Sequence, residues 1–314
     1  MNKLALVFAG QGSQYAGMGL DFVDAYPFLL EKEKEASKIL GYDVRDVLLS
    51  SDGKINETEY TQPLVLLSTI YAYDIFCTLN AQVASVAGFS LGEYSAFYAS
   101  EVFDFNQIMH LIAKRSSLMK DCTIKHPGKM AAILGLSSQE VDRICLESSK
   151  EGIVVSANYN SPIQVVISGE ENAVSHACEL AKQRGAKRAM VLNVSGAFHS
   201  PLMKEAGDGL ASYLKDMSYQ AAQFPIYMNT TAKPLIEKNL FSEMEKQIQS
   251  SVYFEQTIKQ MVRDGITHIV EIGPGTVLSG LIKKINIDIE VTQLGKMNDL
   301  DYLKGWLETY GFNK

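Results

Sequence analysis

Short, largely apolar runs alternate along the chain with longer segments whose apolar residues recur every three or four positions. The first apolar run, at 4–8, precedes a glycine-rich turn, and a second run lies at 83–87 after a long helical pattern from Leu64 to about Leu79. Apolar runs of this length that end at glycine are typical of strands buried on both faces. Strands that alternate with helices in this way predict an α/β domain with a parallel sheet.

A further helix is expected to begin at Asp104, because Gln107 stands three residues later in the manner of a capping box. Its buried side is marked by apolar residues at helical spacing: Ile108, Leu111, Ile112, Leu118 and Met119. The pattern ends in polar and helix-breaking residues at 125–128, which predicts a subdomain boundary there.

Between residues 130 and 192 the order of the expected elements changes. The pattern predicts strands at 130–134, 154–157, 164–168 and 188–192 and helices at 138–148 and 171–184. A β-α-β-β-α-β order over about 65 residues is the ferredoxin-like arrangement. We therefore expect residues 127–195 to form a small ferredoxin-like α+β subdomain, inserted into a large domain of residues 1–126 and 196–314.

The large domain is expected to resume after residue 195. A helix follows Pro201, a strand lies near 224–228, helices fall between about 240 and 262, and a strand at 268–272 leads into Gly273-Pro274-Gly275 and another helix. Because these elements again alternate, the two outer segments together predict a large α/β-hydrolase-like domain with a parallel sheet.

Composition narrows the class of protein. The 314 residues are 46% hydrophobic and 21% charged, as in ordinary soluble globular proteins. The formal net charge of −7 argues against general binding of nucleic acid or of anionic membranes. No apolar run approaches the roughly 20 residues of a membrane-spanning helix. The first residues lead directly into the first expected strand, without the pattern of a signal peptide.

Four cysteines lie far apart, at positions 77, 122, 145 and 178, without a C-x-x-C pair. This spacing is typical of reduced thiols in a cytoplasmic protein, and it indicates neither a disulfide framework nor a zinc site. We expect each cysteine to be buried in the packing of the core. The sequence calls for no metal ion or redox cofactor, and nothing in it demands more than a monomer.

The strongest candidate for chemistry is Ser90, at the centre of Gly88-Phe89-Ser90-Leu91-Gly92. Glycine on both sides permits a sharp strand-to-helix turn that exposes the serine oxygen, and the first N–H groups of the following helix point toward it. The alternative is a chance occurrence of the five-residue pattern, which the strand before it and the helix after it disfavour. Ser90 is therefore the predicted nucleophile.

A serine nucleophile requires a base, and the sequence contains five histidines. His199 lies in the loop 195–201, which leaves one element and precedes the next helix, and loops at sheet ends gather catalytic groups. The other four fall in expected helices, at a strand edge or in the boundary segment: His110, His126, His176 and His268. His199 is therefore the predicted base. No acidic residue between the serine and the histidine has an equally clear loop position, which favours a serine–histidine pair oriented by a neutral acceptor.

Arg115 falls on the apolar side of its helix, seven residues after Ile108 and four after Leu111. A guanidinium directed toward the core is costly unless it meets an anion. One candidate partner is an Asp or Glu of this chain, in an internal ion pair. The other is the carboxylate of a substrate, which the guanidinium fork binds through two hydrogen bonds. The second partner would select an acyl group that carries a free carboxylate.

Two glycine-rich turns, Gly10-Gln11-Gly12-Ser13-Gln14 and Gly273-Pro274-Gly275, resemble phosphate-binding loops at first sight. Neither has the spacing G-x-x-x-x-G-K-[ST] or G-x-G-x-x-G, so a nucleotide site is poorly supported. The first turn could instead offer a backbone N–H to an oxyanion, as the second donor that such a site usually needs.

Taken together, these motifs make the chain resemble the malonyl-CoA:acyl carrier protein transacylases of fatty-acid and polyketide synthesis over essentially its whole length. The markers are the two glycine-rich turns, the Ser90 motif with its continuation Glu93-Tyr94-Ser95-Ala96, Thr61-Gln62-Pro63, Arg115, Asn158-Tyr159-Asn160-Ser161-Pro162 and Gly196-Ala197-Phe198-His199-Ser200. Each marker is weak alone, but so many in this order are specific.

The resemblance implies a role for each matching residue. Ser90 would be the acylated nucleophile, His199 its base, and Arg115 the residue that binds the malonyl carboxylate. The backbone N–H groups of Gln11 and Leu91 would form the oxyanion hole.

Further residues follow from the same resemblance. Gln247 matches the glutamine whose neighbourhood orients the histidine, and Gln62 and Asn160 would line the pocket or support the oxyanion turn. Phe198 resembles the malonyl-preferring form and not the methylmalonyl-preferring one. Phe89 departs from the family, which usually has histidine there, and its side chain cannot make a secondary hydrogen bond of the kind that a histidine makes.

The implied reaction moves malonyl from malonyl-CoA to the phosphopantetheine thiol of acyl carrier protein through a malonyl-serine, with the CoA thioester as substrate and no cofactor. Because that carrier is acidic and this chain is net negative, docking would need a local basic patch. The candidates, which could equally be ordinary solvated side chains, are Lys187, Arg188, Lys283 and Lys284. Two alternatives stay open: a serine esterase or thioesterase on the same turn, and a non-catalytic acyl-carrier or interaction subunit.

Overall fold

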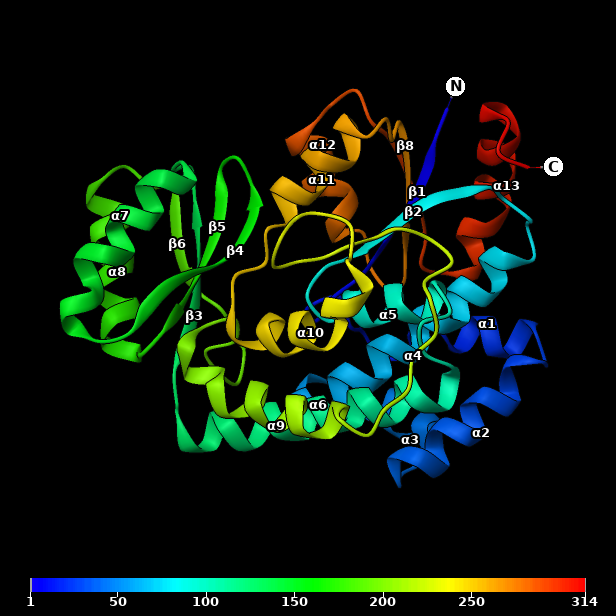
Figure 1. The fold of residues 1–314 in the computed structure, drawn as a ribbon, viewed down its shortest axis with the longest axis horizontal. Helices are drawn as coiled ribbons and strands as arrows, with labels where there is room; N and C mark the ends of the chain where they lie inside the picture. Colours follow the sequence, from blue (N-terminus) through cyan, green and yellow to red (C-terminus); the bar gives the residue numbers. More distant parts are fainter. Residues whose placement is uncertain (1, 314) are drawn as a thin grey trace.

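The computed structural model describes residues 2–313, and its larger sheet consists of five parallel strands in the order β7-β2-β1-β8-β9 (Figure 1). The strands are β1 (Leu4–Phe8), β2 (Val83–Gly88), β7 (Ile226–Tyr227), β8 (His268–Ile272) and β9 (Glu290–Leu294). The predicted parallel sheet is thereby confirmed. Because the strands are parallel, the segments that follow β1, β2 and β8 meet at one edge of the sheet, where ligands bind in open α/β folds.

The central strand β1 is apolar at every position and is buried on both faces. Leu4, Leu6 and Phe8 belong to the larger core, which α4 (Thr58–Cys77), α5 (Gly92–Ala99) and α6 (Phe105–Lys125) help to build. Ala5 and Val7 face the opposite way and pack with α11 (Phe254–Arg263) and α12 (Val277–Ile285). Figure 1 shows α11 and α12 on one side of β1 and β8, with α4 and α5 on the other. The sheet is therefore covered by helices on both faces.

Further helices complete the larger core. They are α1 (Leu20–Ala25), α2 (Leu29–Leu40), α3 (Val44–Leu49), α9 (Lys204–Leu214), α10 (Leu240–Gln249) and α13 (Leu300–Tyr310). Short 3-10 turns occur at η1 (Lys54–Asn56), η2 (Ser149–Glu151), η3 (Pro201–Met203), η4 (Glu237–Asn239) and η5 (Met297–Asp299). Of these elements, α10 matters most for the site, because its last turn packs against the loop that follows residue 195.

The second sheet is antiparallel and has the strand order β4-β5-β3-β6. Its elements are β3 (Lys129–Leu134), α7 (Ser138–Ser148), β4 (Val154–Ser161), β5 (Gln164–Gly169), α8 (Glu171–Gln183) and β6 (Arg188–Val191). Ala131, Ile133 and Val165 point toward α7 and α8, whereas Met130 and Ala132 on the other face join the larger core. The face without helices is therefore turned toward the parallel sheet.

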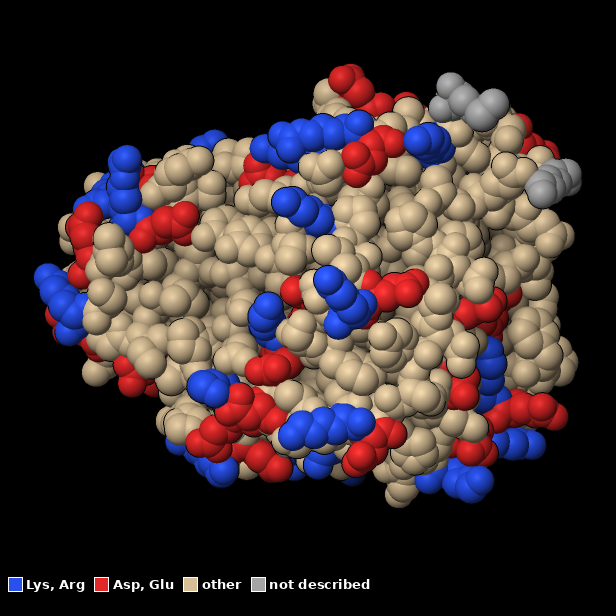
Figure 2. All heavy atoms as spheres, viewed as in Figure 1, with Lys and Arg blue, Asp and Glu red and all other residues tan. Residues whose placement is uncertain are grey.

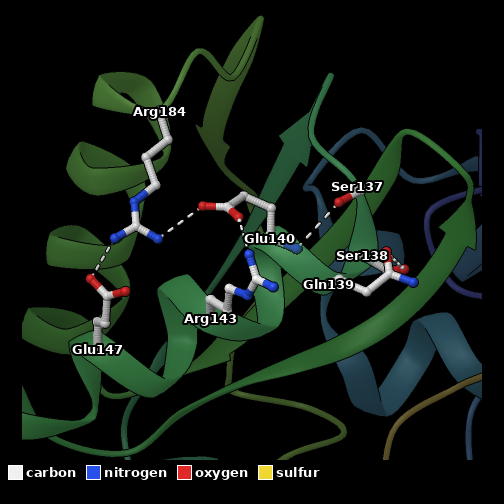
Figure 3. Close-up of polar contacts among 7 residues, drawn as sticks. All are labelled: Ser137, Ser138, Gln139, Glu140, Arg143, Glu147 and Arg184. Atoms are coloured by element: carbon white, nitrogen blue, oxygen red, sulfur yellow. Dashed lines mark hydrogen bonds and ion pairs between the residues drawn. The ribbon is translucent and has the colours of Figure 1, made fainter.

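Ion pairs join α7 and α8 on the outer surface of this unit (Figure 3). The Arg184 guanidinium, just after α8, contacts Glu140 at 2.9 Å and Glu147 at 2.5 Å, both on α7. Ser137 caps α7 by accepting a hydrogen bond from the backbone N–H of Glu140 at 3.3 Å. These ion pairs thus lie on the side of the unit away from the parallel sheet.

Several predicted boundaries are confirmed, including the capping box of Asp104 and Gln107 at the start of α6. The start predicted at Leu64 is wrong, because α4 begins at Thr58 and contains Pro63. Proline removes one backbone hydrogen bond, but α4 is buried along most of its length, and this packing favours the continuous helix.

Two expected strands differ in length. β7 has only two residues of the expected 224–228, because Pro225 lacks an N–H and the chain turns back at Met228, whose N–H donates to the Lys233 carbonyl. β4 runs past 157 to Ser161, since its polar residues pair with β5. The expectation that every cysteine is buried is also wrong, because Cys77 is exposed at the end of α4.

The surface carries charges of both signs. Figure 2 shows Lys and Arg side chains interspersed with Asp and Glu over the face seen in Figure 1, with uncharged surface between the small sheet and α10. Among residues 2–313, no helix combines the length and the apolar character that crossing a bilayer requires.

Candidate active site

Ser90 lies in a sharp turn between β2 and α5, as its flanking glycines predict. A Cβ on Gly88 would lie 1.9 Å from the backbone carbon of Gly92, and a Cβ on Gly92 would lie 2.1 Å from the carbonyl oxygen of Phe8. Only glycine fits at either position. Ser90 itself has a φ of +52°, a conformation that costs a non-glycine residue about 1–3 kcal/mol and that persists only where the surroundings hold it.

The Ser90 hydroxyl is hydrogen-bonded to the predicted base. Its Oγ lies 2.7 Å from Nε2 of His199. On the other side of the ring, Nδ1 lies 2.8 Å from the carbonyl oxygen of Gln247 and 3.2 Å from that of Ser250. Both carbonyls only accept, so the proton of neutral His199 resides on Nδ1 and Nε2 is free to accept the serine proton.

The environment keeps His199 in its neutral form. The side chain is 3% exposed, and burial followed by the charge of Arg115 lowers the pKa of His199 to about 4. Its loop is fixed to α10, because the His199 N–H donates to the carbonyl of Ile248 at 3.1 Å. At neutral pH the imidazole is therefore an unprotonated base with one defined tautomer.

Arg115 projects from α6 into the same region and is 1% exposed. Its guanidinium donates to Gln62 Oε1 at 2.6 Å and to Gln247 Oε1 at 3.1 Å, and it lies 5.0 Å from the centre of the Tyr94 ring. Burial lowers the pKa of Arg115, and Nε has no hydrogen-bond partner among the described residues. The contacts within residues 2–313 include no carboxylate, so the internal ion pair considered as one alternative is not formed there.

One cavity of about 230 Å³ joins these groups. Ser90, His199 and Arg115 line it together with Gln11, Asn160 and Phe198, and so do apolar residues of β3, β5 and α12. Asn160 is buried, and its Oδ1 has no partner within the described part of the chain. The cavity therefore lies between the two sheets and is largely apolar, with a cation and a serine–histidine pair in its wall.

Two further predicted residues lie behind the cavity wall. Gln62 is fully buried and contacts Arg115. It is not among the residues that line the cavity, where it was expected as one possibility. Gln247 faces His199 through its backbone carbonyl only. Its side chain accepts from Arg115 and donates to the Ser90 carbonyl at 2.6 Å. Gln247 thus contacts the base, the nucleophile and the cation at once.

The two predicted oxyanion donors are backbone N–H groups from two different turns. Leu91 directly follows Ser90 at the start of α5, and Gln11 lies in the turn after β1, in the cavity wall. Within residues 2–313, neither backbone N–H has an acceptor. The Gln11 turn is braced by Ser13 Oγ, which donates to the Gly10 carbonyl at 2.7 Å. Both N–H groups are therefore available to a ligand.

Sequence reasoning assigned no role to three residues that contact these groups or support them. Ser250 supplies the second carbonyl to His199, Asn229 contacts the Ser90 turn, and the buried carboxyl of Glu93 contacts Asn229. Glu93 stands next to the serine motif, and a charged residue on that apolar helix is a signal that could have marked it. A metal centre is not indicated, since residues 2–313 contain no group of three His, Cys, Asp or Glu side chains placed to hold an ion.

A serine nucleophile with a neutral histidine base, at a strand-to-helix turn of a parallel sheet, defines an enzyme of acyl chemistry. The family model of the acyl transferase domain matches residues 5–297. The chain belongs to the acyl transferase domain family.

Two relatives of known name match nearly the whole chain. Malonyl CoA-acyl carrier protein transacylase of Staphylococcus aureus (strain MW2) is 38% identical over 311 residues, covering 98% of this chain and 99% of the relative. The protein of the same name from Bacillus subtilis (strain 168) is 37% identical over 289 residues, covering 91% of each.

Solved structures agree with the fold. A transacylase crystal structure from Streptococcus pneumoniae has a TM-score of 0.92 at 39% identity and covers 97% of this chain and 100% of its own. A malonyl-transacylase in complex with its type II polyketide acyl-carrier protein has a TM-score of 0.93 at 34% identity, covering 97% and 99%.

Proposed function

We propose that the protein transfers a malonyl group from malonyl-CoA to the phosphopantetheine thiol of acyl carrier protein through a malonyl-serine intermediate. The observation that carries this proposal is the buried Arg115 guanidinium, which contacts no carboxylate within residues 2–313 and shares a cavity with Ser90 and His199. An acyl group with a free carboxylate supplies the missing anion. The names of the transacylase relatives support the same reaction.

The first half-reaction acylates Ser90. Its Oγ attacks the thioester carbonyl carbon while Nε2 of His199 takes the hydroxyl proton. The oxyanion of the tetrahedral intermediate accepts hydrogen bonds from the N–H groups of Gln11 and Leu91. The carbon–sulfur bond then breaks, and the proton on His199 passes to the CoA sulfur. The products are malonyl-Ser90 and free CoA.

The second half-reaction reverses these steps with a new thiol. The pantetheine thiol of the carrier gives its proton to His199, and its sulfur attacks the malonyl-Ser90 carbonyl. The same two N–H groups hold the second oxyanion. Collapse releases Ser90 Oγ, which takes the proton back. Each step uses groups of one chain and two thiols, so the proposal includes no metal or redox cofactor and needs only a monomer.

Four other residues shape the pocket in this proposal. Phe198, beside the base, limits the space around the acyl carbon next to the carboxylate, and Asn160 offers its free Oδ1 to a substrate N–H. Gln62 and Gln247 hold the Arg115 fork in the plane in which it meets the carboxylate. Gln247 also orients His199 through its carbonyl.

We further propose the division of the chain into a large α/β-hydrolase-like domain of residues 1–126 and 196–314 and a ferredoxin-like subdomain of residues 127–195. The β-α-β-β-α-β order with sheet order β4-β5-β3-β6 supports the second description. Four unpaired cysteines favour a reducing compartment, the cytoplasm.

Two separate pairs of exposed basic residues are the candidates for docking the acidic carrier. Lys283 and Lys284 are exposed at the end of α12, a helix that lines the cavity, and Lys187 and Arg188 are exposed at the start of β6. Replacing these four residues by serine should weaken transfer to the carrier and leave transfer to free pantetheine unchanged.

Intact-mass measurement after mixing with malonyl-CoA tests the proposal. We expect one malonyl adduct on Ser90, lost in Ser90→Ala and discharged by the carrier thiol. No adduct would favour the non-catalytic subunit, and dominant release of free malonate in excess thiol would favour the esterase. Against the esterase stand the neutral partners of His199, because a hydrolase of this type usually orients its histidine with a carboxylate.

A further inference from the structure

Asn229 contacts the turn that carries Ser90 on both sides of Phe89. Its side-chain nitrogen Nδ2 donates to the carbonyl oxygen of Gly88 at 2.6 Å, and its Oδ1 accepts from the Ser90 N–H at 2.7 Å. One planar amide therefore joins the last residue of β2 to the nucleophile. Asn229 is 2% exposed, so both hydrogen bonds are shielded from water.

Asn229 is in turn held by the first turn of α5. Its backbone N–H donates to Glu93 Oε2 at 2.6 Å, and its carbonyl accepts from the Tyr253 N–H at 2.9 Å. Glu93 is fully buried, and within residues 2–313 its Oε1 has no partner. Glu93 follows Ser90 by one helical turn, so the loop after β7 is fixed to the turn on both sides of the nucleophile.

Both backbone polar groups of Ser90 therefore meet side-chain amides. Asn229 accepts from its N–H, and Gln247 donates to its carbonyl. Ser90 has the left-handed φ of +52°, which a residue other than glycine adopts only where its neighbours hold the backbone in place. In that conformation Oγ reaches Nε2 of His199 at 2.7 Å.

We propose that Asn229, held in place by Glu93, is a positioning residue that keeps Ser90 in the conformation in which its oxygen meets His199. The position requires asparagine, because one side chain must accept from Ser90 and donate to Gly88. Aspartate keeps the acceptor and loses the donor, and alanine loses both. The inference rests on the proposed function, in which Ser90 is the nucleophile.

The test separates nucleophile geometry from substrate binding. The rate at which a fluorophosphonate probe labels Ser90, followed by intact mass, reports the activated serine without malonyl-CoA. The dissociation constant of malonyl-CoA is measured separately in a Ser90→Ala background. We expect Asn229→Ala to slow labelling by about 10²-fold, as a displacement near 1 Å does, while the dissociation constant stays unchanged. Asn229→Asp and Glu93→Gln should fall between Asn229→Ala and the parent.

Leu303→Ala is the control, because Leu303 is fully buried in α13 and does not line the cavity. It should lower the stability to urea and label at the parental rate. Folded Asn229→Ala or Asn229→Asp that labels as fast as the parent would overturn the inference, and so would an equal slowing in Leu303→Ala. Absence of labelling in the parent would instead remove the proposed function, and the inference with it.

Discussion

Replacing Arg115 by alanine should change which acyl group is transferred more than it changes acyl transfer itself. The guanidinium is 1% exposed, is held by Gln62 and Gln247, and lies against Tyr94. These neutral contacts orient the guanidinium but do not neutralise its charge. A carboxylate on the acyl group would complete a buried ion pair with Arg115. The variant therefore removes one partner of an ion pair when malonyl is bound, whereas bound acetyl forms no such pair.

The size of the effect follows from the burial. Removing one partner of a buried ion pair costs about 3–5 kcal/mol, and about 1.4 kcal/mol corresponds to a factor of ten. The ratio of kcat/KM for malonyl-CoA to that for acetyl-CoA should therefore fall by about two to three and a half orders of magnitude in Arg115→Ala. Arg115→Lys keeps the charge but loses the fork, so its ratio should fall less.

The assay is a competition between malonyl-CoA and acetyl-CoA, with the two acyl-Ser90 products separated by intact mass. Urea unfolding of each variant shows whether the loss of a partner for Gln62 and Gln247 has destabilised the fold. An unchanged ratio in folded Arg115→Ala would refute the reasoning. An unchanged ratio means an equal effect on both substrates, so Arg115 would then act on the shape of the pocket and not on the carboxylate.

Three further predictions concern titratable groups. His199→Ala should slow acylation of Ser90 by about two to four orders of magnitude in rapid-quench mass measurements, and a near-parental rate would place the base elsewhere. Since the pKa of His199 is lowered to about 4 and its neutral form is the base, the acylation rate should fall only as the pH drops through about 4; a fall centred near 6.5 would contradict this. Burial raises the pKa of Glu93 from 4.5 to about 8, so the folded protein keeps a proton that the unfolded chain releases, and stability from this group falls as the pH rises between these values. Glu93→Gln should flatten that fall in urea unfolding at pH 5 and pH 8, and an equally steep fall would argue against it.

The parts of the site that the sequence predicts well are local in the chain. The turn at Ser90 depends on two glycines within five residues, on the strand before them and on the helix after them. Arg115 is visible because a cation interrupts an apolar stripe at helical spacing. His199 lies 109 positions from Ser90, yet it could be chosen because the other histidines fall in elements where packing or solvent explains them.

The parts that sequence reasoning misses act through the backbone or across the fold. Ser250 contacts His199 through its carbonyl, which every residue possesses, so its residue type carries no signal. Asn229 follows a two-residue strand, and only the sheet order brings it to Ser90. Gln62 contacts Arg115 from behind, a position that depends on how α4 packs on α6 and not on either pattern.

Missed elements have a related cause. The hydrophobic pattern predicts none of α1, α2, α3, β9 and α13. In α2, charged residues occupy half of the positions and only Leu29, Glu33 and Ala36 are buried, which leaves a weak apolar stripe. In β9, Thr292 and Leu294 are buried while Glu290 is exposed, as at the edge of a sheet that is covered on one side. Such elements are stabilised by neighbours more than by their own pattern.

The weakness of the base argues for transfer to a thiol and against hydrolysis, because a hydroxyl gives its proton to such a base only where, like that of Ser90, it is held in a hydrogen bond to the base. With two neutral carbonyls in place of a carboxylate, and with Arg115 nearby, His199 has a pKa of about 4. A thiol with a pKa of about 8.5 gives its proton to such a base far more readily than water, whose pKa is about 15.7. The malonyl-enzyme should therefore react with thiols of increasing pKa at decreasing rates and with water slowest of all. Hydrolysis as fast as transfer to millimolar pantetheine would show that the site activates water and would restore the esterase.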